Sequence, residues 1–519
     1  MRNSLLLMSI LFLVIACIDQ KDYNLNSVEV HPSVAFPIAF GTLTIQDLLK
    51  SKDSLYVKVY PDDLVYLEYS RELVSHDIRD LFTIPDKSIN QSFAIPQGTI
   101  PAHNRDIRSD SVVEVIDLGL SPALLSSIDF KSGTISYSTT LLPGTAGLQY
   151  EILLSSQDLT SKSTSQTLSV VTSSAGSISL SDYKLALNKN KFNLKMVLVL
   201  KKTNSSVLIK TNTSVAVNFS MAAMDFNAIL GFFGDQTANP PSDLLSIGAF
   251  GTTLSPGNVS FAQPVVTLDV INDYGVPCKV NFTKIEARKN GATLALQLNP
   301  ASPVTIAYPA ILGASATTAV AVTNAKQVLD FAPTQIFYQL TARMNQGLVS
   351  GNDFMADTSK LRVKLNVEVP IYGHASGITL RDTAKIDLSK INQSQVQKAS
   401  LKVDAINELP LDARIQLYLT DARYVVLDSL LDTAQTKLIQ GSTVNATGDL
   451  ETAGVLSQAL PLDNDKLNIL FKAKNLIVVA VLNTSKDASG NAVDVKFKSK
   501  YTLKINMGLL ADLKFNIKI

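Results

Sequence analysis

The chain contains no tryptophan, and only two cysteines and four histidines occur among its 519 residues. Two cysteines cannot build a disulfide scaffold or a cysteine-rich zinc or iron–sulfur site. Charged residues make up only 18% of the chain, and the 46 basic residues nearly balance the 45 acidic ones. Nucleic-acid binding needs a basic excess on some face of the protein. We therefore expect no nucleic-acid partner.

Motifs for catalysis and cofactor binding are also missing. The four histidines are His31, His76, His103 and His374, and none of them forms a His-x-His or His-x-x-x-His pair. The sequence has no Gly-x-Ser-x-Gly, Walker or Gly-x-Gly-x-x-Gly motif. Residues 463–465 and 487–491 offer oxygen ligands for calcium but lack the EF-hand register, so we interpret them as hairpin turns. We expect no enzyme, no metal and no cofactor.

The first residues of the chain have the pattern of a secretory signal. Arg2 precedes an apolar run over residues 5–16, which is too short to span a bilayer as a helix. Val14-Ile15-Ala16-Cys17 resembles the lipobox of bacterial lipoproteins. The resemblance implies that residues 1–16 are removed and that Cys17 carries a covalent lipid. This lipid would be the chain's membrane partner, anchoring it in the outer membrane.

Two further patterns resemble those of surface lipoproteins of the Bacteroidota. Asp19-Gln20-Lys21-Asp22 resembles their export signal, which implies exposure at the cell surface and a tether over residues 17–33. Asp-Ser/Thr-apolar triplets resemble the O-glycosylation site of the same bacteria, with the sugar on an exposed hydroxyl. The candidate acceptors are Ser54, Ser111, Thr383, Ser429 and Thr433.

Most of the chain from residue 34 onward alternates apolar and polar residues with a period of two, which predicts strands. Residues 55–60 and 64–69 flank Pro61-Asp62-Asp63 and predict strand, turn and strand. Helical signals are few, although Ser75 is expected to cap a short helix through residue 82. We predict an all-β fold of tandem antiparallel β-sandwich, immunoglobulin-like domains with few short helices.

Two segments of the chain share three landmarks, which predicts an internal repeat. The matched pairs are Ile116-Asp117-Leu118 with Ile386-Asp387-Leu388, residues 148–154 with 413–419, and residues 193–200 with 475–482. Residues 117–226 and 387–519 are therefore expected to be two copies of one β-sandwich. Convergence of generic strand patterns is the alternative. An N-terminal β-rich region over 34–116 and a central domain over 227–386 complete the predicted organisation.

The central domain has two notable segments. Residues 265–287 read as strand, turn and strand, and resemble the immunoglobulin-like LEA-2 or WHy domain. Residues 290–325 carry no charge, so they are expected to be buried, paired or facing a ligand. Cys278 lies in apolar, strand-like sequence and is expected to be a buried thiol. Residues 221–233 are also apolar, and form either a short helix or a buried strand.

We expect a membrane-anchored, non-enzymatic lipoprotein of the bacterial cell envelope that acts as a structural or binding module. Its partner would be an envelope protein or a glycan. One alternative is a lipid-binding or lipid-transfer lipoprotein, whose apolar groove would use residues 221–233 and 290–325. A second alternative is a surface glycan-binding lipoprotein.

Overall fold

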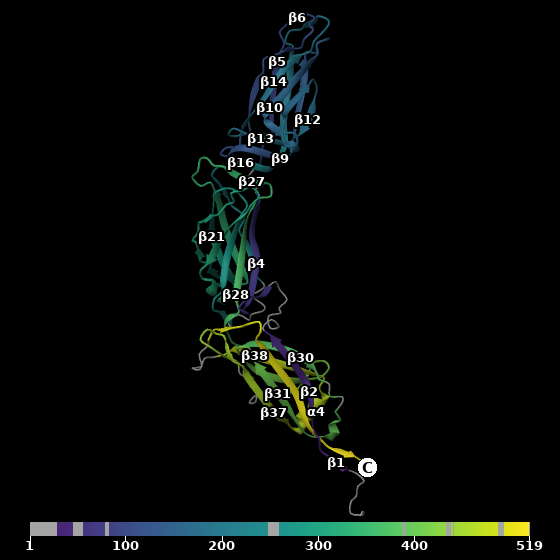
Figure 1. Cartoon of the computed structure of the whole chain (residues 1–519), viewed down its shortest axis with the longest axis vertical. Helices are drawn as coiled ribbons and strands as arrows, with labels where there is room; N and C mark the ends of the chain where they lie inside the picture. Colours follow the sequence, from purple (N-terminus) through teal and green to yellow (C-terminus); the bar gives the residue numbers. More distant parts are fainter. Residues whose placement is uncertain are drawn as a thin grey trace, which may run out of the picture. The chain divides into compact units, whose positions relative to one another are not determined.

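The structure is a computed structural model that describes residues 28–44, 56–77, 83–247, 259–386, 388, 391–431, 437–439, 441–485 and 493–517. Antiparallel strands dominate this part of the chain, and its α-helices are α3 (Ala325–Asp330) and α4 (Asn464–Lys472). The predicted all-β fold is confirmed (Figure 1). Ser75 lies inside strand β4 (Val65–Asp77), so the expected helix cap is wrong, and residues 78–82 of the expected helix lie outside the described residues. Among the described residues, no helix has both the length and the apolar character needed to cross a membrane.

The chain forms two compact units that interleave along the sequence. Unit 1 comprises Met1–Glu68, Ala249–Pro264 and Val369–Ile519, and unit 2 comprises Tyr69–Gly248 and Val265–Glu368. The sequence analysis expected consecutive segments instead, over 34–116, 117–226, 227–386 and 387–519. The interleaving arises because strands far apart in the sequence pair with one another.

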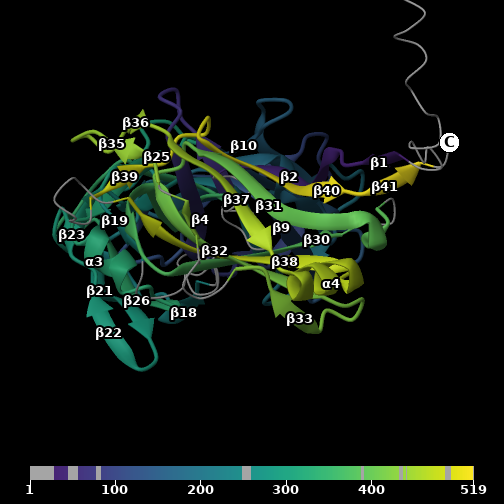
Figure 2. The ribbon, with the colours of Figure 1, turned by 90° about the horizontal axis from the view of Figure 1, so that it is seen from below.

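Unit 1 contains two main sheets whose apolar faces supply its core. The first has the order β2-β40-β31-β37, and the second has the order β30-β38-β32-β33. Their bounds are β2 Ser33–Thr44, β40 Thr502–Leu513, β31 Val396–Asn407, β37 Gly454–Leu462, β30 Ile378–Lys385, β38 Asn475–Thr484, β32 Leu411–Thr420 and β33 Val426–Ser429. Leu401 and Leu509 are buried in the first sheet, and Leu417 and Leu476 are buried in the second. Figure 2 shows these strands from the end that carries α4 and β33.

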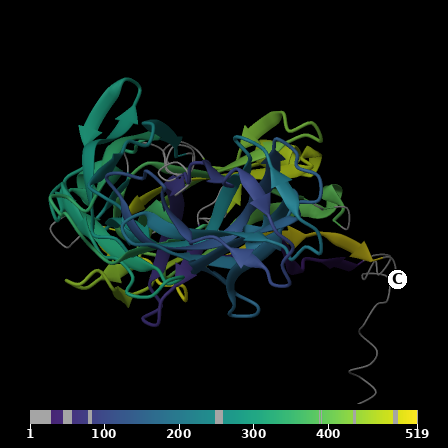
Figure 3. The same ribbon diagram turned by 90° about the horizontal axis from the view of Figure 1, so that it is seen from above.

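The larger sheet of unit 2 has eleven strands, including the two long strands β9 (Leu124–Leu142) and β16 (Ser214–Phe232). The other strands used below are β5 Lys87–Ala94, β8 Val112–Asp117, β10 Tyr150–Ser161, β11 Thr167–Thr172, β12 Gly176–Ser179 and β14 Lys191–Leu200. Phe130 and Phe192 are among its largest fully buried side chains. Figure 3 shows these strands, drawn mostly in blue, from above.

The two segments expected to be repeats have the same strand order. In unit 2, β5-β16-β9-β12 and β11-β10-β14-β8 are neighbours, and in unit 1, β2-β40-β31-β37 and β33-β32-β38-β30 are neighbours. Asn193 pairs with Val115 and Asn475 pairs with Lys385, in each case two residues before the Asp of the matched triplet. The strand pairing matches Tyr150, rather than residue 148, with Ala413, so the sequence alignment of the middle landmark is shifted by two residues. A shift of two keeps the same side chains on the buried face of the strand. The strand order is what duplication of one fold predicts.

Besides a two-stranded sheet of β6 (Gly98–Ile100) and β15 (Val207–Ile209), the described part of unit 2 has two further sheets. One contains β20 (Val265–Asn272), β25 (Ala316–Val322) and β28 (Lys360–Pro370), and the other contains β21 (Cys278–Lys289) and β26 (Gln335–Met344). The predicted strand, turn and strand over 265–287 is confirmed. β20 and β21 belong to different sheets, so the turn between them crosses from one sheet to the other.

The two apolar segments have different environments. Residues 221–233 lie mostly in β16, where Met221, Phe226 and Phe233 are buried in the core. The uncharged residues 290–325 include buried strands, but the side chain of Ile311 is 73% exposed and Tyr308 is 50% exposed. Burial therefore does not hold at the loop preceding β25, whereas pairing with a partner or contact with a ligand there stays a prediction.

The long β9–β16 pairing provides a test of the fold. Gly231 has a φ of +137°, and a Cβ there would lie 2.6 Å from the carbonyl oxygen of Leu124. Gly98 has a similar φ of +140°, with no atom within 4 Å of such a Cβ. Gly98→Ala adds only backbone strain and should cost about 1–2 kcal/mol. Gly231→Ala adds a backbone clash, and we expect a total loss of about 3 kcal/mol or more in urea denaturation. Equal losses would contradict the close approach of β9 and β16.

Candidate functional site

The turn between β20 and β21 carries a dense group of polar side chains in unit 2. The Asp273 amide donates to the Lys360 carbonyl oxygen at 3.0 Å, and the Gly275 amide donates to the Phe354 carbonyl oxygen at 3.0 Å. A Cβ at position 275 would lie 2.3 Å from ring atoms of Phe354. Glycine is therefore required where the turn passes this ring.

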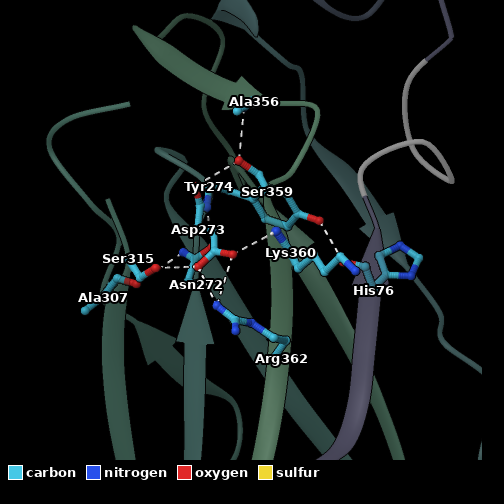
Figure 4. Close-up of polar contacts among 10 residues, drawn as sticks. All are labelled: His76, Asn272, Asp273, Tyr274, Ala307, Ser315, Ala356, Ser359, Lys360 and Arg362. Atoms are coloured by element: carbon cyan, nitrogen blue, oxygen red, sulfur yellow. Dashed lines mark hydrogen bonds and ion pairs between the residues drawn. The ribbon is translucent and has the colours of Figure 1, made fainter. Parts of the chain in front are cut away.

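The Asp273 carboxylate lies at the centre of the group (Figure 4). Arg362 on β28 donates from Nη2 to both carboxylate oxygens, at 2.9 and 3.1 Å. The Ser315 hydroxyl donates at 2.7 Å and the Lys360 amide donates at 3.2 Å. Because both oxygens are already engaged by charged and neutral donors, this carboxylate joins strands rather than presenting a free base.

The neighbours of Asp273 extend the network to other strands. Asn272 is fully buried, accepts from the Tyr274 amide at 3.0 Å and donates to the Ala307 carbonyl oxygen at 3.1 Å. The Tyr274 hydroxyl donates to the His76 carbonyl oxygen on β4 at 2.9 Å. We call this network the Asp273 cluster, and its members are Asn272, Asp273, Tyr274, Ser315, Ser359, Lys360 and Arg362.

Two other carboxylates are also held by partners inside their own unit. Burial raises the pKa of Asp353, although its side chain accepts from the Phe233 amide at 2.9 Å and from Asn345 at 2.5 Å. In unit 1, burial acts to raise the pKa of Asp449, but hydrogen bonds from Lys498 and Lys496 outweigh it and lower the pKa to about 2. Both carboxylates stabilise packing and neither faces an open site.

The histidines lie in separate parts of the chain. His31 pairs with Glu29 at 2.8 Å and His374 pairs with Asp494 at 2.7 Å, both in unit 1. His103 and His76 lie in unit 2, with His103 Nδ1 at 3.0 Å from the Pro101 carbonyl oxygen. Within the described residues, no group of three or more His, Cys, Asp or Glu side chains could hold a metal ion.

The candidate modification sites are partly described. Ser111 is exposed just before β8, Thr383 is exposed on β30, and Ser429 is half-buried on β33. The lipidation candidate Cys17 and the glycosylation candidates Ser54 and Thr433 lie outside the described residues. Glycosylation at all five hydroxyls stays a prediction, and exposure favours Ser111 and Thr383 over Ser429.

Two other expectations can be compared with the structure. Cys278 begins β21 as a buried free thiol, which confirms the expectation, and burial raises its pKa to about 12. Asp463 does not lie in a hairpin turn, because it caps α4 by accepting from the Lys466 amide at 2.7 Å. The hairpin interpretation is therefore wrong at residues 463–465. Residues 487–491 fall outside the described residues.

The Asp273 cluster was not recognised in the sequence. The pattern placed a turn after residue 270, but Ser315 and Arg362 follow Asp273 by 42 and 89 residues. Sequence spacing alone does not reveal that these side chains meet. The available signal was a lone Asp in an Asn-Asp-Tyr-Gly turn between two apolar strands. An Asp at such a position is common in turns whether or not it has a charged partner, so it does not predict the cluster.

Comparisons with known proteins give no family. No family model matches the chain, and no curated protein matches its sequence. Among solved structures it is similar to one from Parabacteroides distasonis described as a "putative secreted protein", with 13% identity and a TM-score of 0.30, covering 55% of this chain and 88% of that one. A TM-score this low does not establish a common fold. The functional proposal therefore stands on the residues of this chain.

The Asp273 cluster can be tested by stability measurements. Asp273→Ala leaves the Arg362 guanidinium and Ser315 without their shared acceptor, so we expect a loss of about 2–4 kcal/mol in free energy of unfolding. Asp273→Asn keeps an acceptor and should fall between this variant and the unaltered chain. Asp330→Ala is the control, because it breaks an exposed pair with Lys326 and should cost about 0.5 kcal/mol or less. A loss at Asp273 no larger than the control would show that the cluster does not stabilise unit 2.

Proposed function

We propose that the chain is a lipid-anchored, non-enzymatic protein of the bacterial cell envelope that acts as a structural or binding module. The observation that carries this proposal is Val14-Ile15-Ala16-Cys17 directly after a short apolar run. A signal of this kind exports the chain, and acyl chains on one cysteine provide stable membrane attachment. The covalent lipid is the only non-protein group in the proposal.

The arrangement of polar side chains supports a structural or binding role. Asp273, Asp353 and Asp449 are each held by donors from their own unit, which is how carboxylates stabilise packing. The large apolar side chains of 221–233, such as Met221, Phe226 and Phe233, are buried in the core. This burial removes one of the two segments that motivated a lipid-binding groove, and it favours the structural reading over lipid transfer.

We further propose that the protein faces outward from the outer membrane, where its partner is an envelope protein or a glycan. Asp19-Gln20-Lys21-Asp22 after the proposed anchor supports this orientation. The exposure of Ser111 and Thr383 supports it as well, because glycosylation requires an accessible hydroxyl.

Lipidation is tested by replacing one cysteine at a time. Cys17→Ala removes the acceptor of the lipid, so we expect an unprocessed chain without the mass of the lipid. Cys278→Ala is the matched control, because it removes the other cysteine and should leave processing and lipid mass unchanged. Mass spectrometry of the purified chains and metabolic labelling with a fatty acid are the measurements. An unmodified Cys17 in the unaltered chain would overturn the proposal.

Orientation is tested by protease treatment of intact cells. If the protein faces outward, the protease should remove it while a periplasmic marker stays intact. The same protease applied to lysed cells should degrade both proteins, which controls for intrinsic resistance of the β-sheets. Full protection in intact cells, with degradation after lysis, would place the protein on the periplasmic side and contradict the proposed orientation.

A further inference from the structure

The turn between β32 and β33 in unit 1 exposes consecutive large apolar side chains. We call residues 424–427 the apolar tip. Tyr424, Val425 and Val426 are 55%, 55% and 53% exposed, and Leu427 is 40% exposed. Single apolar residues are common on protein surfaces, whereas a contiguous group marks an interaction site. The apolar tip is therefore a candidate interaction surface.

Hydrogen bonds hold the apolar tip in one conformation. The Asp421 carboxylate accepts from the Arg423 amide at 2.8 Å and from the Val425 amide at 2.9 Å. Asn475 on β38 donates to the Asp421 carbonyl oxygen at 2.8 Å, and Tyr424 has a φ of 64°. The apolar side chains are thus displayed by a preorganised turn, which lowers the ordering entropy lost on binding.

The apolar tip lies at the end of unit 1 where the chain enters from Cys17. β2 begins at Ser33, which pairs with Asp512, and β37, at the other edge of the same sheet, ends at Leu462 at this same end. Helix α4 then leads to Asn475, which pairs with Thr420 directly before the tip. Figure 1 shows α4 and the strand β1 (Val28–Val30) toward this end of unit 1, and Figure 2 shows β33 beside α4.

The length of the tether keeps this end close to the proposed anchor. Eleven residue steps separate Cys17 from Val28. An extended chain covers at most about 3.3–3.6 Å per residue, so Val28 lies within about 40 Å of the anchor. A tether of this reach allows the apolar tip to contact the membrane that holds the lipid.

Cations accompany the apolar tip. The Arg423 side chain is 87% exposed, and Lys474, whose amide donates to the Thr420 carbonyl oxygen at 2.9 Å, is also exposed. The Asp421 carboxylate accepts from two backbone amides, and its Oδ2 also lies 3.7 Å from the Arg423 Nε. Segments that bind membrane interfaces combine apolar and aromatic side chains with Lys and Arg facing anionic headgroups.

We propose that the apolar tip inserts into the headgroup boundary of the phospholipid bilayer in which Cys17 is anchored. The inference rests on the proposed lipidation. The tip supplies a second membrane contact, which gives unit 1 a defined orientation on the bilayer. The tyrosine ring and the valine side chains enter the boundary, while Arg423 and Lys474 face the phosphates.

The test uses the full lipidated protein in vesicles of phosphatidylethanolamine and phosphatidylglycerol. An environment-sensitive fluorophore is attached to Val425→Cys, or to Val455→Cys as the matched control. Val455 is 70% exposed on β37 and lies at the opposite end of the sheet from Leu462. The buried Cys278 is replaced by Ala in both chains, so that one thiol reacts. Iodide quenching of the fluorophore is measured with and without vesicles.

We expect vesicles to protect the fluorophore at position 425 from iodide and to leave position 455 accessible. Val425→Asp with Val426→Asp, compared with Val455→Asp, should raise iodide access to a fluorophore on Tyr424→Cys by at least about tenfold, because charged residues do not partition into the boundary. Equal access at positions 425 and 455 overturns the inference. Protection at position 425 without vesicles also overturns it, because a second copy of the chain then covers the tip.

The two proposals fail in distinguishable ways. Mass spectrometry of the same preparation reports whether Cys17 carries a lipid, independently of the fluorophore. A lipidated chain with an accessible tip refutes only the membrane contact. A chain without the lipid refutes the proposed anchor, and the quenching comparison with added vesicles still decides whether the tip binds phospholipid.

Discussion

The antiparallel pairing of β2 with β40 is the interaction on which unit 1 depends. It joins residues near the start of the chain to residues near its end, for example Ser33 to Asp512, which are 479 residues apart. The backbone groups of one side of β40 have no other strand partner in this sheet, because β2 is its edge. Pro37 is accommodated where the pairing shifts register, as expected for an edge strand. Closing so long a loop makes this pairing a late, non-local step of folding.

The same constraint explains why the units interleave. In unit 2, β16 pairs with β5, a strand that precedes the first repeat. In unit 1, β40 pairs in the same way with β2. The edge strand beside each repeat therefore comes from a segment that precedes the repeat in the sequence. A boundary drawn at residue 117 or 387 cuts through such a module, because β8 and β30 also precede these positions. Repeats can share one fold without being consecutive pieces of sequence.

Local structure was predictable where the signal was local. Pro61-Asp62-Asp63 correctly placed the turn between β3 (Tyr56–Val59) and β4, and Asp63 adopts the left-handed φ of 66° that such a turn uses. The helix cap expected at Ser75 failed because the pairing of β4 with β28 outweighs a capping residue. Asp463 shows the opposite error, since a helix cap and a hairpin turn use the same residue types.

Contacts between distant residues were not predictable, and this limits what sequence reveals about the candidate site. Arg362 and Asp273 meet only because β20 and β28 pair in one register. Nothing in either local sequence distinguishes this pair from the other charges of the chain. The repeat landmarks pointed to two segments with the same strand order because each segment could be compared with the other, and a single cluster offers no such internal comparison.

Carboxylates such as Asp273 and Asp353 bond to their own unit, while the apolar tip of unit 1 faces outward. The lipid proposed on Cys17 would bring the chain close to a membrane without orienting it. With such an anchor, a weak second contact would be sufficient, because the effective concentration of the tip at the bilayer would be in the range of about millimolar. The proposed insertion of residues 424–427 would then orient a unit that the lipid alone would leave free to rotate.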